Sequence, residues 1–126
     1  MLKMRAALSM HSCSHAFSSS SGRALLASID QGTSSSRVIL YDAATLSPVA
    51  SHQVELQSAT TNPQAGWSQM DPMKILSTVD ASARGALEKA GASVKDVLGV
   101  GITNQRESTV VWDKRTGEPL YDCGLW

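Results

Sequence analysis

The sequence is poor in residue types that mark specialised classes of protein. Only 5% of its 126 residues are aromatic, and only two are cysteines. Cys13 and Cys123 have no partner at metal-site spacing, and two cysteines in a chain of this length do not make a disulfide framework. The composition therefore favours a reducing compartment.

An excess of charge of one sign is also missing. The 11 basic and 11 acidic residues give a formal net charge of zero, so nothing favours a general attraction to nucleic acid or anionic membranes. No apolar run approaches the roughly 20 residues that span a bilayer. With 42% hydrophobic residues, the chain is long enough for one small domain with a moderate core.

Residues 1–22 lack acidic residues and any sustained hydrophobic period. They are rich in Ser, His, Ala and Met and contain the run Ser18–Ser21, which is typical of a disordered extension outside the fold. A basic, serine-rich composition is also typical of an organellar transit peptide. We therefore expect a cytoplasmic protein, with mitochondrial targeting as the alternative, and a folded portion covering residues 23–126.

The folded portion opens with strand patterns. Two apolar runs, residues 24–29 and 38–41, flank a polar segment that contains a glycine and predict a β-hairpin. Residues 49–56 alternate between apolar and polar side chains, as a half-buried third strand does. Residues 57–69 are polar and predict a loop, in which Trp67 is expected to cover the core.

A helix and further strands are expected next. Asp71 followed by Pro72 is typical of a helix start, and an apolar stripe at helical spacing continues until Gly91. The apolar run 97–103 predicts a strand covered on both faces, and shorter strands are expected at 108–112 and from residue 120. One helix cannot cover such a sheet, so we expect the front of a larger α/β protein.

The polar segment of the hairpin has the chemistry of a phosphate site. Asp30 offers oxygens that a hard cation prefers, and Gly32 is expected to take a positive φ and allow close approach of a ligand. Residues 33–36 add four hydroxyls and a row of amides, and Arg37 adds a fixed cation. The same residue types also make ordinary hairpin loops, so both interpretations stay open. The segment is not a Walker A loop, because no Gly-Lys-Ser/Thr closes it.

A second polar group, NQRE at residues 104–107, follows the apolar strand 97–103. In open α/β sheets, ligands bind at the carboxyl ends of the strands. From the residues alone, Arg106 and Glu107 are equally consistent with a surface ion pair.

The chain from Leu25 to Trp126 resembles the glycerol kinases, within the carbohydrate kinase family that has the actin-like, ribonuclease-H-like ATPase fold. The segments that carry the resemblance are DQGTSSSR (30–37), GW (66–67) with QMDP (69–72), GITNQRE (101–107), and VVWD (110–113) with TGEPLY (116–121). Sugar kinases share the first segment loosely, whereas the NQRE quartet is more particular to glycerol kinases. The resemblance implies the N-terminal part of an α/β ATPase domain, with a mixed sheet, a hairpin start and a covering helix.

The resemblance also implies a role for each matched residue. It assigns the phosphates of ATP to the hairpin residues Gly32, Thr33, Ser34, Ser35 and Arg37. It assigns Mg²⁺ to Asp30. It assigns glycerol to Arg106, Glu107 and Trp126. The aspartate that acts as general base lies later in the family's chain, beyond residue 126.

The implied activity is ATP-dependent phosphorylation of glycerol to sn-glycerol 3-phosphate, by a full-length protein expected to be a homo-oligomer. The 126 residues alone are expected to be inactive. Two alternatives stay open: another polyol or sugar kinase of the same family, and a non-catalytic nucleotide-binding or partner-binding module.

Overall fold

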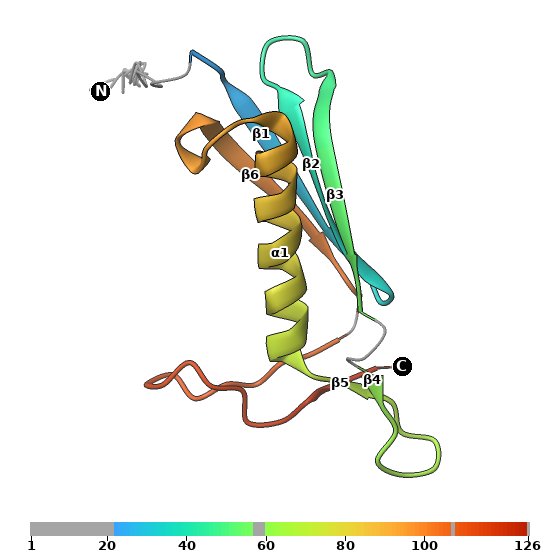
Figure 1. Ribbon diagram of the computed structural model, residues 1–126. Helices are drawn as coiled ribbons and strands as arrows, with labels where there is room; N and C mark the ends of the chain where they lie inside the picture. The colour runs from blue at the N-terminus through green and yellow to red at the C-terminus, as the bar shows by residue number, and fades with distance from the viewer. Residues whose placement is uncertain (1–21, 57–59, 107, 126) are drawn as a thin grey trace, which may run out of the picture.

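A computed structural model describes residues 22–56, 60–106 and 108–125 (Figure 1). The expected extension at residues 1–21 lies outside the described residues, as do Glu107 and Trp126. The described chain forms a four-stranded sheet with one long helix across one face. A small second sheet, which contains β4 and β5, lies beyond the N-terminal end of that helix.

The main sheet is mixed. Its strands are β1 (Leu25–Gln31), β2 (Ser35–Asp42), β3 (Pro48–Glu55) and β6 (Val97–Asn104), in the order β3-β2-β1-β6. β1 pairs antiparallel with β2 and parallel with β6, so the chain must cross over between β3 and β6. The helix α1 (Pro72–Ala90) and a short 3-10 helix, η1 (Val94–Asp96), make this crossover. The small sheet has the order β4-β5-β7, with β4 (Thr60–Thr61), β5 (Gln69–Met70) and β7 (Cys123–Gly124).

Helix α1 begins and ends where the sequence predicts. One carboxylate oxygen of Asp71 accepts hydrogen bonds from the backbone N–H groups of Met73, at 2.8 Å, and Lys74, at 3.4 Å. Gly91 has a left-handed φ of 60°, and its N–H donates to the carbonyl of Glu88. Among the described residues, no helix is both long and apolar enough to cross a bilayer.

The helix packs closely against β2 and β3. Leu25, Val38 and Leu40 of the sheet and Ala86 of the helix form the buried core on this face. At Gly85 an added Cβ would lie 2.4 Å from Cδ2 of His52 on β3. Only glycine therefore allows the helix to approach the third strand this closely.

Buried hydroxyls join α1 to the beginning of β2. The hydroxyl of Ser82 donates to the carbonyl of Ser36 at 2.9 Å. The Ser36 hydroxyl lies 2.9 Å from the Thr78 hydroxyl, which in turn donates to the carbonyl of Ile75. These bonds hold the hairpin end of β2 firmly against the helix, because buried polar groups without partners are costly.

The first three strands are confirmed, but the prediction for residues 97–103 is wrong in one respect. Among the described strands, β6 pairs with β1 alone and forms an edge of the sheet. Val100 is 56% exposed and Ile102 is 71% exposed. The apolar run predicts the strand correctly. It does not predict whether other elements cover both faces of that strand.

The predicted strands after β6 are also largely wrong. Residues 108–112 form no strand; Trp112 makes only an isolated bridge to Pro119. The last expected strand is reduced to β7. Within the expected loop, β4 and β5 form instead, and Trp67 is 54% exposed, so it does not cover the core. Strand propensity is realised only where a neighbouring strand is available, and these segments have few such neighbours.

Candidate functional site

The candidate site lies where two parallel strands end side by side. In the β1–β6 pairing, Asp30 lies opposite Thr103 and Gln31 lies opposite Asn104. A cavity of about 270 Å³ opens at this end of the sheet. The residues that line it are Asp30, Gln31, Gly32, Thr33, Asn104, Gln105, Arg106, Ser108 and Leu125. We call it the polar cavity.

The polar cavity brings together the two groups that the sequence singles out. Asp30, Gly32 and Thr33 come from the β1–β2 turn, and Arg106 comes from the quartet that follows β6. These segments are more than 70 residues apart in the sequence, and a single parallel strand pairing places them on one cavity.

The turn itself is tight. Gln31 pairs with Ser36, and the Gly32 N–H donates to the carbonyl of Ser35 at 2.9 Å. The positive φ predicted for Gly32 is wrong, because the turn is built without a left-handed residue at that position. An added Cβ at Gly32 would meet only the Ser35 carbonyl oxygen, at 3.4 Å. The fold therefore tolerates a methyl group here, and a need for glycine at this position would come from a ligand.

Two polar side chains of the turn have no hydrogen-bond partner among the described residues. Among the described residues, the carboxylate of Asp30 and the hydroxyl of Thr33 make no hydrogen bond to protein, and both residues are exposed. Mg²⁺ typically binds through one or two carboxylates with water and phosphate oxygens, which fits Asp30. The described residues contain no group of three or more His, Cys, Asp or Glu that would hold a metal without such help.

The other predicted phosphate contacts lie away from this cavity. Ser34 lines a separate hollow with Glu55 and Thr60, and its carbonyl accepts the N–H of Leu56 at 2.8 Å. Arg37 donates from Nε, at 2.8 Å, and from Nη2, at 2.6 Å, to the Gln53 side-chain oxygen on β3.

Ser35 begins β2, where it pairs with Glu55. Contacts of Ser34, Ser35 and Arg37 with phosphate stay predictions. Of the predicted glycerol residues, Arg106 is exposed on the polar cavity. Glu107 and Trp126 lie outside the described residues, so their roles also stay predictions.

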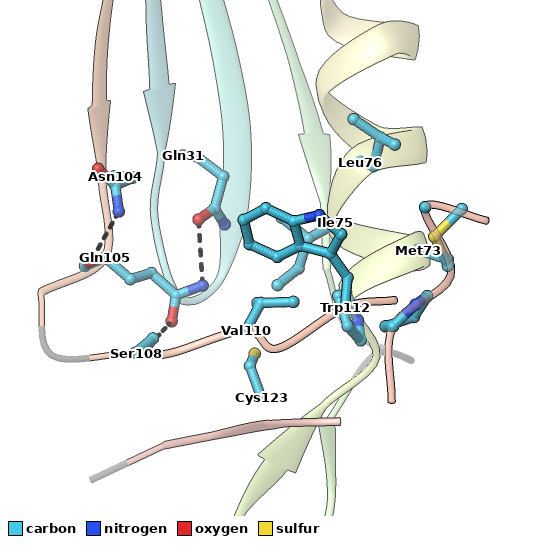
Figure 2. A pocket seen from close by; sticks show the side chains of 13 residues that line it. Gln31, Met73, Ile75, Leu76, Asn104, Gln105, Ser108, Val110, Trp112 and Cys123 are labelled. Carbon is cyan, nitrogen blue, oxygen red and sulfur yellow. Dashed lines mark hydrogen bonds between the residues drawn. The ribbon is translucent and has the colours of Figure 1, made fainter. Parts of the chain in front are cut away.

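A second, apolar cavity of about 420 Å³ adjoins the first (Figure 2). Apolar side chains from the start of α1 and from residues 110–123 line most of it, including Met73, Leu76, Trp112 and Cys123. Burial raises the pKa of the Cys123 thiol, whose Sγ donates to the Met70 carbonyl at 3.3 Å. Burial therefore disfavours the reactive thiolate form of Cys123.

The sequence predicts no individual role for the residues that separate the two cavities. Gln31, Asn104, Gln105 and Ser108 line both of them. These residues lie within or next to the 30–37 segment and the NQRE group. Only the pairing of β1 with β6 shows that the two segments lie side by side.

The family of the chain follows from comparison with known proteins. Residues 25–126 match the N-terminal domain of the FGGY family of carbohydrate kinases. The chain belongs to this family. The match covers both the β1–β2 turn and the strand end that carries Arg106, which are the two halves of the polar cavity.

Relatives of this FGGY chain include glycerol kinases. It is 46% identical over 105 residues to a probable glycerol kinase of Caenorhabditis elegans, covering 81% of this chain and 20% of that protein. It is 49% identical over 98 residues to a glycerol kinase of Pseudomonas entomophila, covering 78% of this chain and 19% of that protein. The chain thus spans about a fifth of the length of these relatives.

Solved structures of FGGY kinases share the fold. The chain matches a Plasmodium falciparum glycerol kinase with ADP at a TM-score of 0.68 and 30% identity, over 82% of this chain and 20% of that one. It matches a xyloylose kinase from Brucella ovis at a TM-score of 0.71 and 24% identity, over 81% and 21% of the two chains. The expected α/β, ribonuclease-H-like architecture is therefore confirmed as part of such a domain.

Proposed function

We propose that this FGGY chain is the N-terminal part of an ATP-dependent glycerol kinase. The complete protein, meaning the natural polypeptide that contains residues 1–126, transfers the γ-phosphoryl group of ATP to a terminal hydroxyl of glycerol and forms sn-glycerol 3-phosphate. The observation that carries this proposal is the polar cavity, which joins the Gly32–Thr33 turn to Arg106. The glycerol kinases among its relatives support this choice of substrate.

The β1–β2 turn binds the nucleotide in this proposal. The Thr33 hydroxyl and the amides of the turn donate to phosphate oxygens, together with the hydroxyls of Ser34 and Ser35, and Arg37 offsets charge nearby. Asp30 would hold Mg²⁺, which would supply positive charge to offset the charge of the phosphates. Enzymes of this kind work mainly by positioning and by stabilising charge, so a rigid turn between two paired strands suits the task.

The end of β6 binds the polyol. Arg106 donates to one hydroxyl of glycerol and Glu107 accepts from another, which a polyol requires and an apolar pocket cannot supply. We assign Trp126 to the carbon backbone of glycerol, as the resemblance implies. The general base is an aspartate beyond residue 126, so the 126 residues alone are expected to be inactive.

The test is a substrate panel on the complete protein, with ATP and Mg²⁺ and with glycerol, xylulose, gluconate and other polyols as acceptors. We expect glycerol to give the highest kcat/KM. Arg106→Ala is expected to lower kcat/KM for glycerol by roughly 100-fold or more, because a charge-assisted contact to the substrate is lost. Arg115→Ala, in an exposed turn away from the cavity, is the matched control.

The outcomes separate the alternatives. A preference for another acceptor would make the protein a different kinase of the family. Nucleotide binding without transfer to any acceptor would make it a non-catalytic module. Glycerol phosphorylation by the 126-residue chain alone would contradict the assignment of the base to a later segment.

We infer a homo-oligomer of the complete protein, which light scattering of the purified enzyme tests. We infer a cytoplasmic location, and fusion of residues 1–22 to a fluorescent protein tests the alternative. Import of the fusion into mitochondria would establish a targeting segment.

A further inference from the structure

Three side chains form a directed chain of hydrogen bonds across the candidate site (Figure 2). The hydroxyl of Ser108 donates to Oε1 of Gln105 at 3.4 Å. Nε2 of Gln105 donates to Oε1 of Gln31 at 3.2 Å. Nε2 of Gln31 donates to the backbone carbonyl of Gly32 at 2.6 Å. The chain thus begins just after Arg106 and ends on the backbone of the proposed phosphate turn.

The direction of this chain is set by its last acceptor. The Gly32 carbonyl only accepts, so Gln31 must present its nitrogen to it and its oxygen to Gln105. Gln105 must then present its nitrogen to Gln31 and its oxygen to the Ser108 hydroxyl. Aligned amides polarise one another, so each bond in such a chain strengthens the next.

The two glutamine side chains are shielded from solvent, Gln31 almost fully and Gln105 in part. Gln31 is 8% exposed, and Gln105 is half-buried. The Gln105 nitrogen also lies 3.7 Å from Sδ of Met70 on β5, a residue that is fully buried. The amide of Gln105 is therefore in contact with the β1 end, the small sheet and the segment after β6.

The same two glutamines form part of the wall between the cavities. Gln31 and Gln105 line the polar cavity on one side and the apolar cavity on the other. Their amide groups are committed to each other and to the backbone rather than offered to a ligand. This arrangement fits a structural link between two binding segments better than a direct substrate contact.

We propose that Gln105 is a positioning residue for phosphoryl transfer. Through Gln31 it holds the segment that carries Arg106 at a fixed distance from the Gly32–Thr33 turn, so that the polyol hydroxyl and the phosphate are aligned. The inference rests on the proposed function, because it needs the two segments to bind the two substrates. Each substrate keeps its own contacts when the link is cut, and only their relative placement is lost.

The test is kinetic and uses Gln105→Met in the complete protein, because methionine keeps the length of the side chain and removes both hydrogen bonds. Misplacement of reacting groups lowers kcat, and we expect a loss of roughly 10- to 100-fold. We expect KM for ATP and for glycerol to stay within about threefold of the wild-type values. Gln64→Met, on an exposed loop, is the matched control.

A double-substitution cycle tests the link itself. Gln31→Met is expected to lower kcat as Gln105→Met does, and the double variant is expected to be no worse than the more damaged single one, because one link is cut either way. Gln105→Glu keeps the acceptor for Ser108 but cannot donate to Gln31, so it is expected to be as damaging as Gln105→Met. Ser108→Thr keeps the hydroxyl and is expected to retain more activity than Ser108→Ala.

The outcomes are distinguishable. Wild-type enzyme that does not phosphorylate glycerol overturns the proposed function and this inference with it. Active wild-type enzyme with an unchanged kcat in Gln105→Met overturns the inference alone. A rise in KM for glycerol at constant kcat would make Gln105 a substrate contact instead, and additive losses in the cycle would show that the two amides act separately.

Discussion

The two turns that connect β2 to its neighbours lie at opposite ends of the sheet and use similar residues in opposite ways (Figure 1). In the β2–β3 turn, one carboxylate oxygen of Asp42 accepts from the N–H of Ala44 and from the N–H and hydroxyl of Thr45. In the β1–β2 turn, the carboxylate of Asp30 and the hydroxyl of Thr33 bond to none of the described residues.

The β2–β3 turn is a structural turn, whereas the β1–β2 turn is the proposed binding turn. Asp, Thr and Ser are common in turns because their side chains replace backbone partners. Where those bonds are made, as at Asp42, the side chain stabilises the turn itself. Where they are not made and a cavity adjoins, as at Asp30, the same residues remain available to a ligand. The residue types in a turn therefore predict ligand binding less well than does the absence of hydrogen-bond partners for their polar atoms.

The largest expected difference between the turns is in activity. Thr33→Val is expected to lower kcat/KM of the complete protein by about 100-fold, because the proposed contact of this hydroxyl with the transferring phosphate is lost. Thr45→Val in the other turn is expected to leave activity unchanged and to lower the unfolding temperature. Steady-state kinetics and thermal unfolding of both variants check this, and equal effects on activity would remove the distinction.

The carboxylates of the two turns are expected to differ in their dependence on magnesium. Asp30→Asn is expected to raise the Mg²⁺ concentration needed for half-maximal rate by roughly tenfold, since the anionic oxygen of the proposed ligand is lost. Asp42→Asn removes the same charge at the other end of the sheet and is expected to leave this requirement unchanged. Titration of activity with Mg²⁺ measures both, and a shift in the Asp42 variant would point to a fault in folding.

A third turn sharpens the comparison, because residues 113–118 repeat the pattern of the β2–β3 turn. Asp113 accepts from Arg115 and Thr116 as Asp42 does from Ala44 and Thr45. The left-handed position, however, holds Gly117 with φ 80° in one turn and Leu46 with φ 57° in the other.

A left-handed conformation is unfavourable for leucine and not for glycine. Leu46→Gly is therefore expected to stabilise the protein by about 1 kcal/mol, less the entropy that glycine gains in the unfolded chain. Gly117→Leu is expected to destabilise by a similar amount. Thermal unfolding measures both, and a lower unfolding temperature for Leu46→Gly would show that leucine packing outweighs the strain.

The smallest expected effect is on the dependence of stability on pH. Hydrogen bonds from the Thr45 N–H, the Thr45 hydroxyl and the Ala44 N–H lower the pKa of Asp42 below its usual 3.8. This contribution to stability is present above the unfolded-state pKa and is lost as the pH falls through the lower pKa of the folded state. Asp42→Asn is therefore expected to flatten the acid limb of a plot of unfolding temperature against pH, below about pH 4.

Local signals in the sequence predicted the parts of the fold that local chemistry decides. The N-cap of Asp71, the end of α1 at Gly91 and the alternation in β3 are visible in the sequence and are confirmed. The predictions that were wrong depend on how segments pack against one another. Residues 108–112 have the composition of a strand but lack a neighbour that would pair with them, and the exposure of Ile102 depends on what lies beside β6.

The site was predictable as two motifs but not as one cavity. Asp30, Thr33 and Arg106 carry recognisable chemistry, and the rule that ligands bind at the carboxyl ends of strands predicts where they lie. The contact of Gln31 with Gln105 depends on the register of two strands that are far apart in sequence. No local signal fixes that register.

The irregularity in the β1–β6 pairing has a consequence for how this segment tolerates length changes. The register shifts between Leu25 and Leu26, at the opposite end of the strands from the polar cavity, and is regular from Leu26 to Gln31. One extra residue in β1 at the shift would leave the register of the following residues unchanged. One residue inserted after Ile29 would instead move the β1–β2 turn by about 3.3 Å along β6, and the side chains after the insertion would face the opposite side of the sheet. Natural variation in strand length should therefore accumulate at the amino end of β1 and be excluded from its last residues.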